Sequence, residues 1–194
     1  MNSLYIDTST KYLCIGIAKD YQIIYKIQQE AIKKQSELAI PFLKKALDEV
    51  SLTLKDIHEI GVTIGPGSFT GIRIGMCIAK VIASTQKIPL KAISSLNAYA
   101  GVGKKIVILD AKAQRVYLGI YKNNQKCIDE TIIEISKLSE IMNQYSDYDI
   151  VLDSHLIGRE SEKIDVIENM NRISMTSTIV ENVDSLVPIY LKDR

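Results

Sequence analysis

The sequence predicts an α/β fold made of two tandem lobes, each a mixed β-sheet flanked by helices. The first observation behind this prediction is that the chain aligns with itself without a gap, Ile6–Lys19 against Leu109–Lys122. Both copies read as an apolar strand, an aspartate, a short polar turn and an alternating strand. The second observation is that helical and strand patterns alternate after each copy, which is typical of a sheet covered by helices. We therefore predict a structural duplication with a reduced second lobe.

The two aligned segments share identical residues at equivalent positions. A few identities in a short window arise by chance, but the shared order of elements favours duplication. The identical pairs are Asp7 and Asp110, Gly16 and Gly119, Ile17 and Ile120, and Lys19 and Lys122.

Hydrophobic periodicity assigns the elements of the first lobe, residues 1–102. Apolar runs and two-residue alternation predict a meander of strands, whereas long segments with apolar residues about every 3.6 positions predict helices. Short buried runs between the helices indicate further strands. The expected elements are strands Leu4–Asp7, Tyr12–Lys19 and Gln22–Gln28, helix Gln35–Val50, strand Ile60–Ile64, helix Thr70–Gln86, strand Leu90–Ser94 and a short helix near Leu96–Ala100.

The glycine-containing stretch Gly101–Lys105 marks the boundary to the second lobe, residues 103–194. The same periodicities apply there as far as Asp153, where the pattern fades. The stretch through Asn169–Thr178 to Pro188 leaves little room for full helices. The expected elements are strands Ile106–Asp110, Arg115–Tyr121 and Thr131–Ile135, helix Lys137–Tyr145 and strand Ile150–Asp153.

Composition excludes several classes of function. The chain of 194 residues is 46% apolar and carries a net charge of +1, so no electrostatic footprint indicates nucleic acid or membrane as a direct partner. No stretch predicts a membrane span or a signal peptide, and we expect a cytoplasmic protein. Cys14, Cys77 and Cys127 lie in apolar runs without a C-x-x-C spacing, which predicts buried free thiols.

The run Gly65–Gly71, which reads Gly-Pro-Gly-Ser-Phe-Thr-Gly, predicts a tight loop between a strand and a helix. Glycine adopts positive φ at low cost and proline fixes its own φ, so the loop is pre-shaped. A glycine-rich turn of this kind leaves backbone N–H groups that bind phosphates and other anions. No Gly-Lys-Ser/Thr follows, so it is not a Walker A loop. The loop alone leaves both a bare connector and an anion site open.

Two such lobes in tandem resemble the actin–Hsp70–sugar-kinase (RNase H-like) superfamily, in which an aspartate after the first strand of each lobe faces a nucleotide. Several motifs together resemble, more specifically, the TsaB (YeaZ) family, from the first strand nearly to the C-terminus. These motifs are Ile6–Thr10, Gln35–Glu37, Gly65–Gly75, Ala79–Lys80, Ser94–Leu96, Asp110–Ala111 with Val116–Tyr117, and Pro188–Lys192.

The resemblance implies a non-catalytic scaffold subunit of the bacterial system that makes N6-threonylcarbamoyladenosine (t6A) at adenosine 37 of ANN-decoding tRNAs. In that system TsaD transfers the threonylcarbamoyl group from threonylcarbamoyl-adenylate, and TsaE is an ATPase that resets the complex. The chain is then expected to bind TsaD, and with it TsaE, and to meet tRNA only through TsaD. When alone it is expected to form a homodimer. It needs no cofactor of its own, whereas the wider complex uses ATP and Mg²⁺.

Neither metal chemistry nor peptidase chemistry is expected. The resemblance implies that TsaD-type relatives hold a metal with an H-x-x-x-H pair, but the corresponding place here reads Ser94–Ala98, without imidazole. His58 and His155 are far apart in sequence, and no short ligand spacing occurs. The sequence also lacks H-E-x-x-H and G-x-S-x-G motifs. We therefore predict no catalytic residue and no metal ligand.

A nucleotide-facing site is the remaining chemical candidate. Asp after a strand also caps its own turn, so capping is the simpler interpretation. The second turn, Ala111–Ala113, lacks the hydroxyls of Thr8–Thr10, which favours capping over autonomous ATP binding and argues against the rival class, a free-standing small-molecule kinase or ATPase. Contact with a nucleotide at a partner interface stays open. The candidate residues are Asp7, Thr8, Ser9, Gly65, Gly67, Ser68 and Asp110.

The two long helices are the predicted partner surface. Thr70–Gln86 is apolar nearly all round and Gln35–Val50 has a wide apolar arc, so they either lie deep in the domain or also meet a partner. Family resemblance implies that this helix pair packs on the equivalent pair of TsaD. The row Gly71, Gly75, Ala79 and Ala83 admits a close neighbour, which the residues leave open as own helix, own sheet or partner. The predicted partner-binding residues are Leu38, Phe42, Arg73, Met76, Lys80 and Ala83.

The sequence predicts which way two side chains of the helix Thr70–Gln86 face, and it differs from the family pattern at two places. Met76, between Arg73 and Lys80, is expected to face outward, and Ile78 to face the sheet. The family's His-Ser-Glu is Gln35–Glu37 here, so a role of that imidazole is lost, and the reduced second lobe puts TsaE docking there in doubt.

Overall fold

The first sheet follows the meander and the glycine loop. The computed structural model describes residues 1–159 and 164–191, and its first sheet has the strand order β3-β2-β1-β4-β5. Strand β1 pairs with β2 antiparallel and with β4 parallel, and β5 extends the sheet parallel to β4. The strands are β1 (Asn2–Asp7), β2 (Tyr12–Lys19), β3 (Gln22–Glu30), β4 (Glu59–Thr63) and β5 (Leu90–Ile93).

The second sheet repeats this arrangement. Its order is β10-β6-β7-β8, with β9 paired to β7. Strand β6 pairs with β7 antiparallel and with β10 parallel, as β1 does with β2 and β4. The duplication predicted from the sequence is therefore confirmed. The strands are β6 (Lys104–Lys112), β7 (Arg115–Lys122), β8 (Gln125–Lys126), β9 (Thr131–Glu134) and β10 (Asp149–Leu152).

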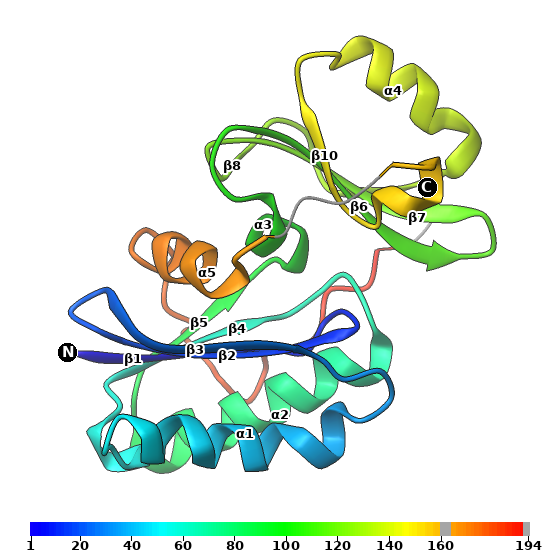
Figure 1. Cartoon of the computed structure of the whole chain (residues 1–194). Helices are drawn as coiled ribbons and strands as arrows, with labels where there is room; N and C mark the ends of the chain where they lie inside the picture. The colour runs from blue at the N-terminus through cyan, green and yellow to red at the C-terminus, as the bar shows by residue number, and fades with distance from the viewer. Residues whose placement is uncertain (160–163, 192–194) are drawn as a thin grey trace.

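Helices form layers around and between the sheets (Figure 1). The long pair α1 and α2 covers one face of the first sheet, α3 and α5 lie between the two sheets, and α4 lies on the outer side of the second sheet. Short 3₁₀ helices connect them at Leu54–Asp56, Ile135–Lys137 and Ser154–Ile157. The helices are α1 (Gln35–Glu49), α2 (Phe69–Gln86), α3 (Ser95–Ala100), α4 (Leu138–Gln144) and α5 (Val166–Ser174).

Helix α5 corrects the expectation that little room for helices remains beyond Asp153. Asp165 caps its N-terminus by accepting a hydrogen bond from the backbone N–H of Glu168. The apolar side packs on the first sheet, where a Cβ on Gly16 of β2 would lie 2.1 Å from Ile167. The periodicity is hard to see in the sequence because Asn169, Asn171 and Ser174 are buried with the apolar residues.

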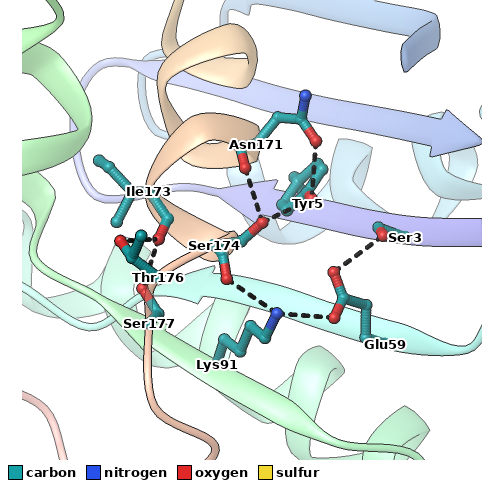
Figure 2. Close-up of polar contacts among 9 residues, drawn as sticks. All are labelled: Ser3, Tyr5, Glu59, Lys91, Asn171, Ile173, Ser174, Thr176 and Ser177. Atoms are coloured by element: carbon teal, nitrogen blue, oxygen red, sulfur yellow. Dashed lines mark hydrogen bonds and ion pairs between the residues drawn. The ribbon is translucent and has the colours of Figure 1, made fainter. Parts of the chain in front are cut away.

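Buried polar contacts hold the C-terminal end of α5 on the first sheet (Figure 2). Lys91 on β5 forms an ion pair of 2.7 Å with Glu59 on β4 and donates to the carbonyl of Ser174 at 2.8 Å. The Tyr5 hydroxyl reaches the Asn171 side chain at 3.0 Å. Helix α5 comes from the second half of the sequence, so these contacts tie the predicted second lobe to the first sheet.

The segment after α5 returns along the first lobe and is called here the strap, residues 179–190. It begins with a bridge between Ile179 and Lys91 at the edge of β5, and it ends where the Ile189 N–H donates to the carbonyl of Ile64 at 2.7 Å. Between these points Lys80 of α2 donates to two strap carbonyls. The last residue of the predicted C-terminal motif, Lys192, lies outside the described residues.

Candidate functional site

A cleft of about 820 Å³ opens between the lobes, where the glycine loop faces the start of the second meander. Four of the predicted nucleotide-facing residues line it, namely Ser9, Gly67, Ser68 and Asp110. Asp7, Thr8 and Gly65 lie behind the lining and are buried. The duplicated topology thus brings the loop and the second aspartate together across the cleft.

Both carboxylate oxygens of Asp7 accept hydrogen bonds from residues of the first lobe. One carboxylate oxygen accepts hydrogen bonds from the Ser9 backbone N–H at 2.9 Å and from the Thr63 hydroxyl at 2.6 Å, and the other accepts from the Tyr99 hydroxyl at 2.9 Å. The side chain has 0% exposure. Burial and the neighbouring Asp7 charge raise the pKa of Tyr99 well above its usual value, so the phenol stays a donor. The arrangement agrees with the capping interpretation.

Asp110 repeats the capping geometry at the cleft surface. Its carboxylate accepts from the Lys112 backbone N–H at 2.8 Å, two residues on, as Asp7 accepts from Ser9. The Lys112 ammonium lies 2.5 Å from the other oxygen. Burial raises the pKa of Asp110, but the bonds from the Lys112 side chain and backbone outweigh it and lower that pKa overall.

Opposite charges balance one another around the cleft. Lys11 and Glu30 approach to 4.0 Å, and Lys112 pairs with Asp110. Asp153 also lines the cleft and accepts from the Asp110 backbone N–H at 2.9 Å. Lys33 lines the cleft as well, so three lysines stand against the carboxylates of Glu30, Asp110 and Asp153. A polyphosphate would therefore meet balanced charges rather than a positive field.

The glycine loop is built around Thr8 rather than around a ligand. The Thr8 hydroxyl donates to the carbonyl of Gly71 at 2.6 Å and accepts from the N–H of Gly75 at 3.1 Å, so it enters the first turns of α2. A Cβ on Gly71 would lie 2.0 Å from the Thr8 carbonyl oxygen. Ser68 caps α2 by accepting from the Gly71 N–H at 3.2 Å. The close neighbour of the small-residue row, left open by the sequence, is therefore this turn and the sheet beneath it.

Helix α2 has a different orientation from the expected one. Met76, predicted to face outward, is 3% exposed and lies in the core with Ala83, which is 2% exposed. Arg73 and Lys80 both form hydrogen bonds with the strap, so they lie along one edge of the outer face of α2. Met76 lies on the buried side of this edge, between the helix and the core. Ile78, predicted to face the sheet, is only partly buried.

The outer face of α2 is centred on Cys77 and Val81, both exposed. The prediction of buried thiols was therefore wrong for Cys77, and also for Cys127, which lies exposed in the turn after β8, while Cys14 is buried. On α1, Leu38 and Phe42 are half-buried against the core and Ile40 is 56% exposed.

In the segment Ser94–Ala98, which lacks an imidazole, Ser94 forms hydrogen bonds within the protein. Ser94 caps α3 and donates to the carboxylate of Glu130 at 2.5 Å, and Tyr121 donates to the same oxygen at 2.5 Å. In the described ranges 1–159 and 164–191, no group of three or more His, Cys, Asp or Glu residues is arranged to hold a metal. Within the same ranges, no helix is long and apolar enough to cross a membrane.

The two sheets repeat one pattern, in which the first strand pairs antiparallel on one side and parallel on the other, and a cleft opens between them. This architecture is that of the actin–Hsp70–sugar-kinase class of α/β folds. Residues 23–182 match the family TsaD, tRNA N6-adenosine threonylcarbamoyltransferase. The chain belongs to this family. Its relatives place it with TsaB (YeaZ), as the motifs indicated.

Sequence relatives and a solved structure support this placement. The TsaB protein of Buchnera aphidicola (Schizaphis graminum), named for tRNA threonylcarbamoyladenosine biosynthesis, is 29% identical over 98% of this chain and 93% of its own length. An uncharacterised MG208 homologue of Mycoplasma pneumoniae is 30% identical over 98% and 94%. A Pseudomonas aeruginosa protein similar to peptidase YeaZ superposes with a TM-score of 0.85 at 19% identity, over 98% of this chain and 99% of that one.

Proposed function

We propose that this chain is a scaffold subunit of the cytoplasmic t6A system, without catalytic residues of its own. It binds TsaD, and with it TsaE, and supports threonylcarbamoyl transfer to adenosine 37 of ANN-decoding tRNAs. It forms a homodimer when alone and contacts tRNA only through TsaD, and the ATP and Mg²⁺ are used by the wider complex. Membership in the TsaD family and relatives named for t6A biosynthesis support this proposal.

The observation that carries the proposal is the apolar outer side of α1 and α2. Both helices cover the first sheet with one face (Figure 1). Ile40 of α1 and Val81 of α2 nevertheless leave more than half of their side chains exposed. Exposed aliphatic side chains on adjacent helices favour a partner helix. Among the predicted partner residues, Arg73, Lys80, Leu38 and Phe42 remain candidates, while Met76 and Ala83 support the helix from below.

The experiment is co-purification with TsaD followed by a tRNA modification assay with and without this chain. We expect a stable complex and t6A formation that depends on both proteins. A TsaD preparation that modifies tRNA equally well without this chain, or that never binds it, contradicts the proposal.

Two substitutions in α2 test where the partner binds. Val81→Glu places a carboxylate on the exposed face, so the chain should fold and lose TsaD. Met76→Glu places it in the dry core, where an unpaired charge costs several kcal/mol, so this variant should unfold. Thermal melting and gel filtration with TsaD compare them, with Ile24→Glu on exposed β3 as control. If Val81→Glu still binds TsaD normally, the partner uses another surface.

The interlobe cleft is the observation that favours a second candidate function, that of a nucleotide-dependent kinase or ATPase of the same fold class. We expect weak ATP binding by the isolated chain, because Asp7 is occupied and the Asp110 carboxylate is paired with Lys112. Titration calorimetry measures this affinity. Micromolar or tighter binding that Asp110→Ala abolishes would favour the kinase-like function instead.

A further inference from the structure

A groove of about 510 Å³ lies between the outer face of α2 and the strap. It runs beside the exposed Val81, so it is continuous with the surface proposed above to bind TsaD. Helix α2, from Phe69 to Gln86, contains no acidic residue, and both of its cations line the groove. The lining residues are Arg73, Met76, Cys77, Lys80, Val81, Ser84 and Thr85 of α2 and Asp184, Leu186 and Pro188 of the strap.

The strap holds Arg73 in a fixed orientation. The Arg73 Nε–H donates to the Tyr190 hydroxyl at 2.9 Å, and the guanidinium carbon lies 3.7 Å from the centre of the Phe69 ring. Phe69 and Tyr190 stack with ring centres 5.3 Å apart. Within the described residues, the terminal amino groups of Arg73 donate no hydrogen bond. A planar guanidinium held in this way presents a ready fork to a carboxylate.

The strap also positions Lys80 without neutralising it. The ammonium donates to the backbone carbonyls of Asp184 at 2.9 Å and Leu186 at 3.1 Å. Both acceptors are uncharged backbone carbonyls. Asp184 also lines the groove, but in the part of the chain that the structure describes no carboxylate forms an ion pair with Arg73 or Lys80, so two cations and one acidic residue leave the lining net positive.

The two cations of the groove favour an acidic helix over a second copy of α2 as the bound partner. If α2 of a second copy lay in the groove, Arg73 and Lys80 would meet an identical helix that offers cations and no carboxylate. Like charges brought together at an interface disfavour that pairing, whereas a helix with an acidic residue beside an aliphatic one complements the groove.

We propose that the groove binds a helix of the heterologous partner that presents a carboxylate to Arg73, and that the strap is the positioning element for this contact. This inference rests on the proposed function, because the partner is taken to be TsaD. Arg73 and Lys80 then select the heterodimer over the homodimer.

The test measures the affinity of the full chain for TsaD over a series of salt concentrations. Arg73→Gln should weaken binding by about tenfold or more at low salt and flatten its salt dependence. Tyr190→Phe keeps the ring but removes the acceptor for Arg73, so it should weaken binding less, and adding it to Arg73→Gln should cause no further loss. Lys122→Gln, which removes a charge from the second lobe, is the control and should bind within about twofold of the unsubstituted chain.

Two results overturn the inference. Unchanged TsaD affinity and salt dependence in Arg73→Gln would show that the groove is unused, while the complex itself, and with it the proposed function, would stand. Weaker self-association of Arg73→Gln in sedimentation would make a second copy the occupant, whereas the proposal expects stronger self-association. If the unsubstituted chain never binds TsaD, the proposed function fails as well.

Discussion

Gly71→Ala should destabilise the chain, although alanine is the better helix former. In an exposed helix interior this change stabilises by roughly 0.5–1 kcal/mol. Here the added Cβ would lie 2.0 Å from the Thr8 carbonyl oxygen, a backbone atom that cannot move alone. Overpacking of this kind costs about 1–3 kcal/mol or more, which exceeds the gain in helix propensity, so the free energy of unfolding should decrease. We expect the melting temperature to fall by roughly 5–10 °C.

The control for Gly71→Ala is Gly158→Ala. Gly158 has a φ of +70°, and an added Cβ would find nothing within 4 Å. This variant should show only the strain of the left-handed backbone, about 1 kcal/mol. Differential scanning calorimetry compares the two. If Gly71→Ala melts at or above the temperature of the unsubstituted chain, the β1–β2 turn yields to α2, and the close approach described here is not a constraint.

Most of the fold could be predicted because the long helices and all strands except the two-residue β8 have a local signature. Strand β2 runs over the predicted Tyr12–Lys19, and α1 and α2 differ from prediction by one residue at one end. Helix α5 was missed because its buried side mixes apolar residues with Asn169, Asn171 and Ser174, which find partners only in the folded chain. Its capping pattern, Asp165 followed by Glu168, was the available signal.

The candidate site was predictable in composition but not in orientation. Strand ends and the glycine loop indicated which residues gather at the cleft, and four of them line it. The outer face of α2 was misplaced because its edge is defined by the strap. Arg73 and Tyr190 are 117 residues apart, and no periodicity within α2 reports that contact. Met76 was therefore assigned to the surface although it is buried.

Lys91→Met should give the largest loss of stability through an electrostatic cause. The Lys91 and Glu59 side chains are 9% and 6% exposed, and their ion pair lies beneath the end of α5. Among the described residues, removing the cation leaves the carboxylate with the Ser3 hydroxyl alone. The Ser174 carbonyl loses its shorter hydrogen bond and keeps the one from the Ser177 N–H at 3.3 Å. Breaking a buried pair on one side costs about 3–5 kcal/mol, which corresponds to a melting temperature lower by roughly 10 °C or more.

The double variant Lys91→Met/Glu59→Met separates the charge from the helix contact. If the unpaired carboxylate causes the loss, the double variant should recover most of it, because apolar replacement of a whole buried pair is often neutral. Hydrogen exchange should then show α5 protected again. A double variant no more stable than Lys91→Met would instead assign the loss to the Ser174 carbonyl, the end of the helix where a cation is most favourable. A single variant within about 1 kcal/mol of the unsubstituted chain would contradict both explanations, since an ion pair worth that little behaves as an exposed one.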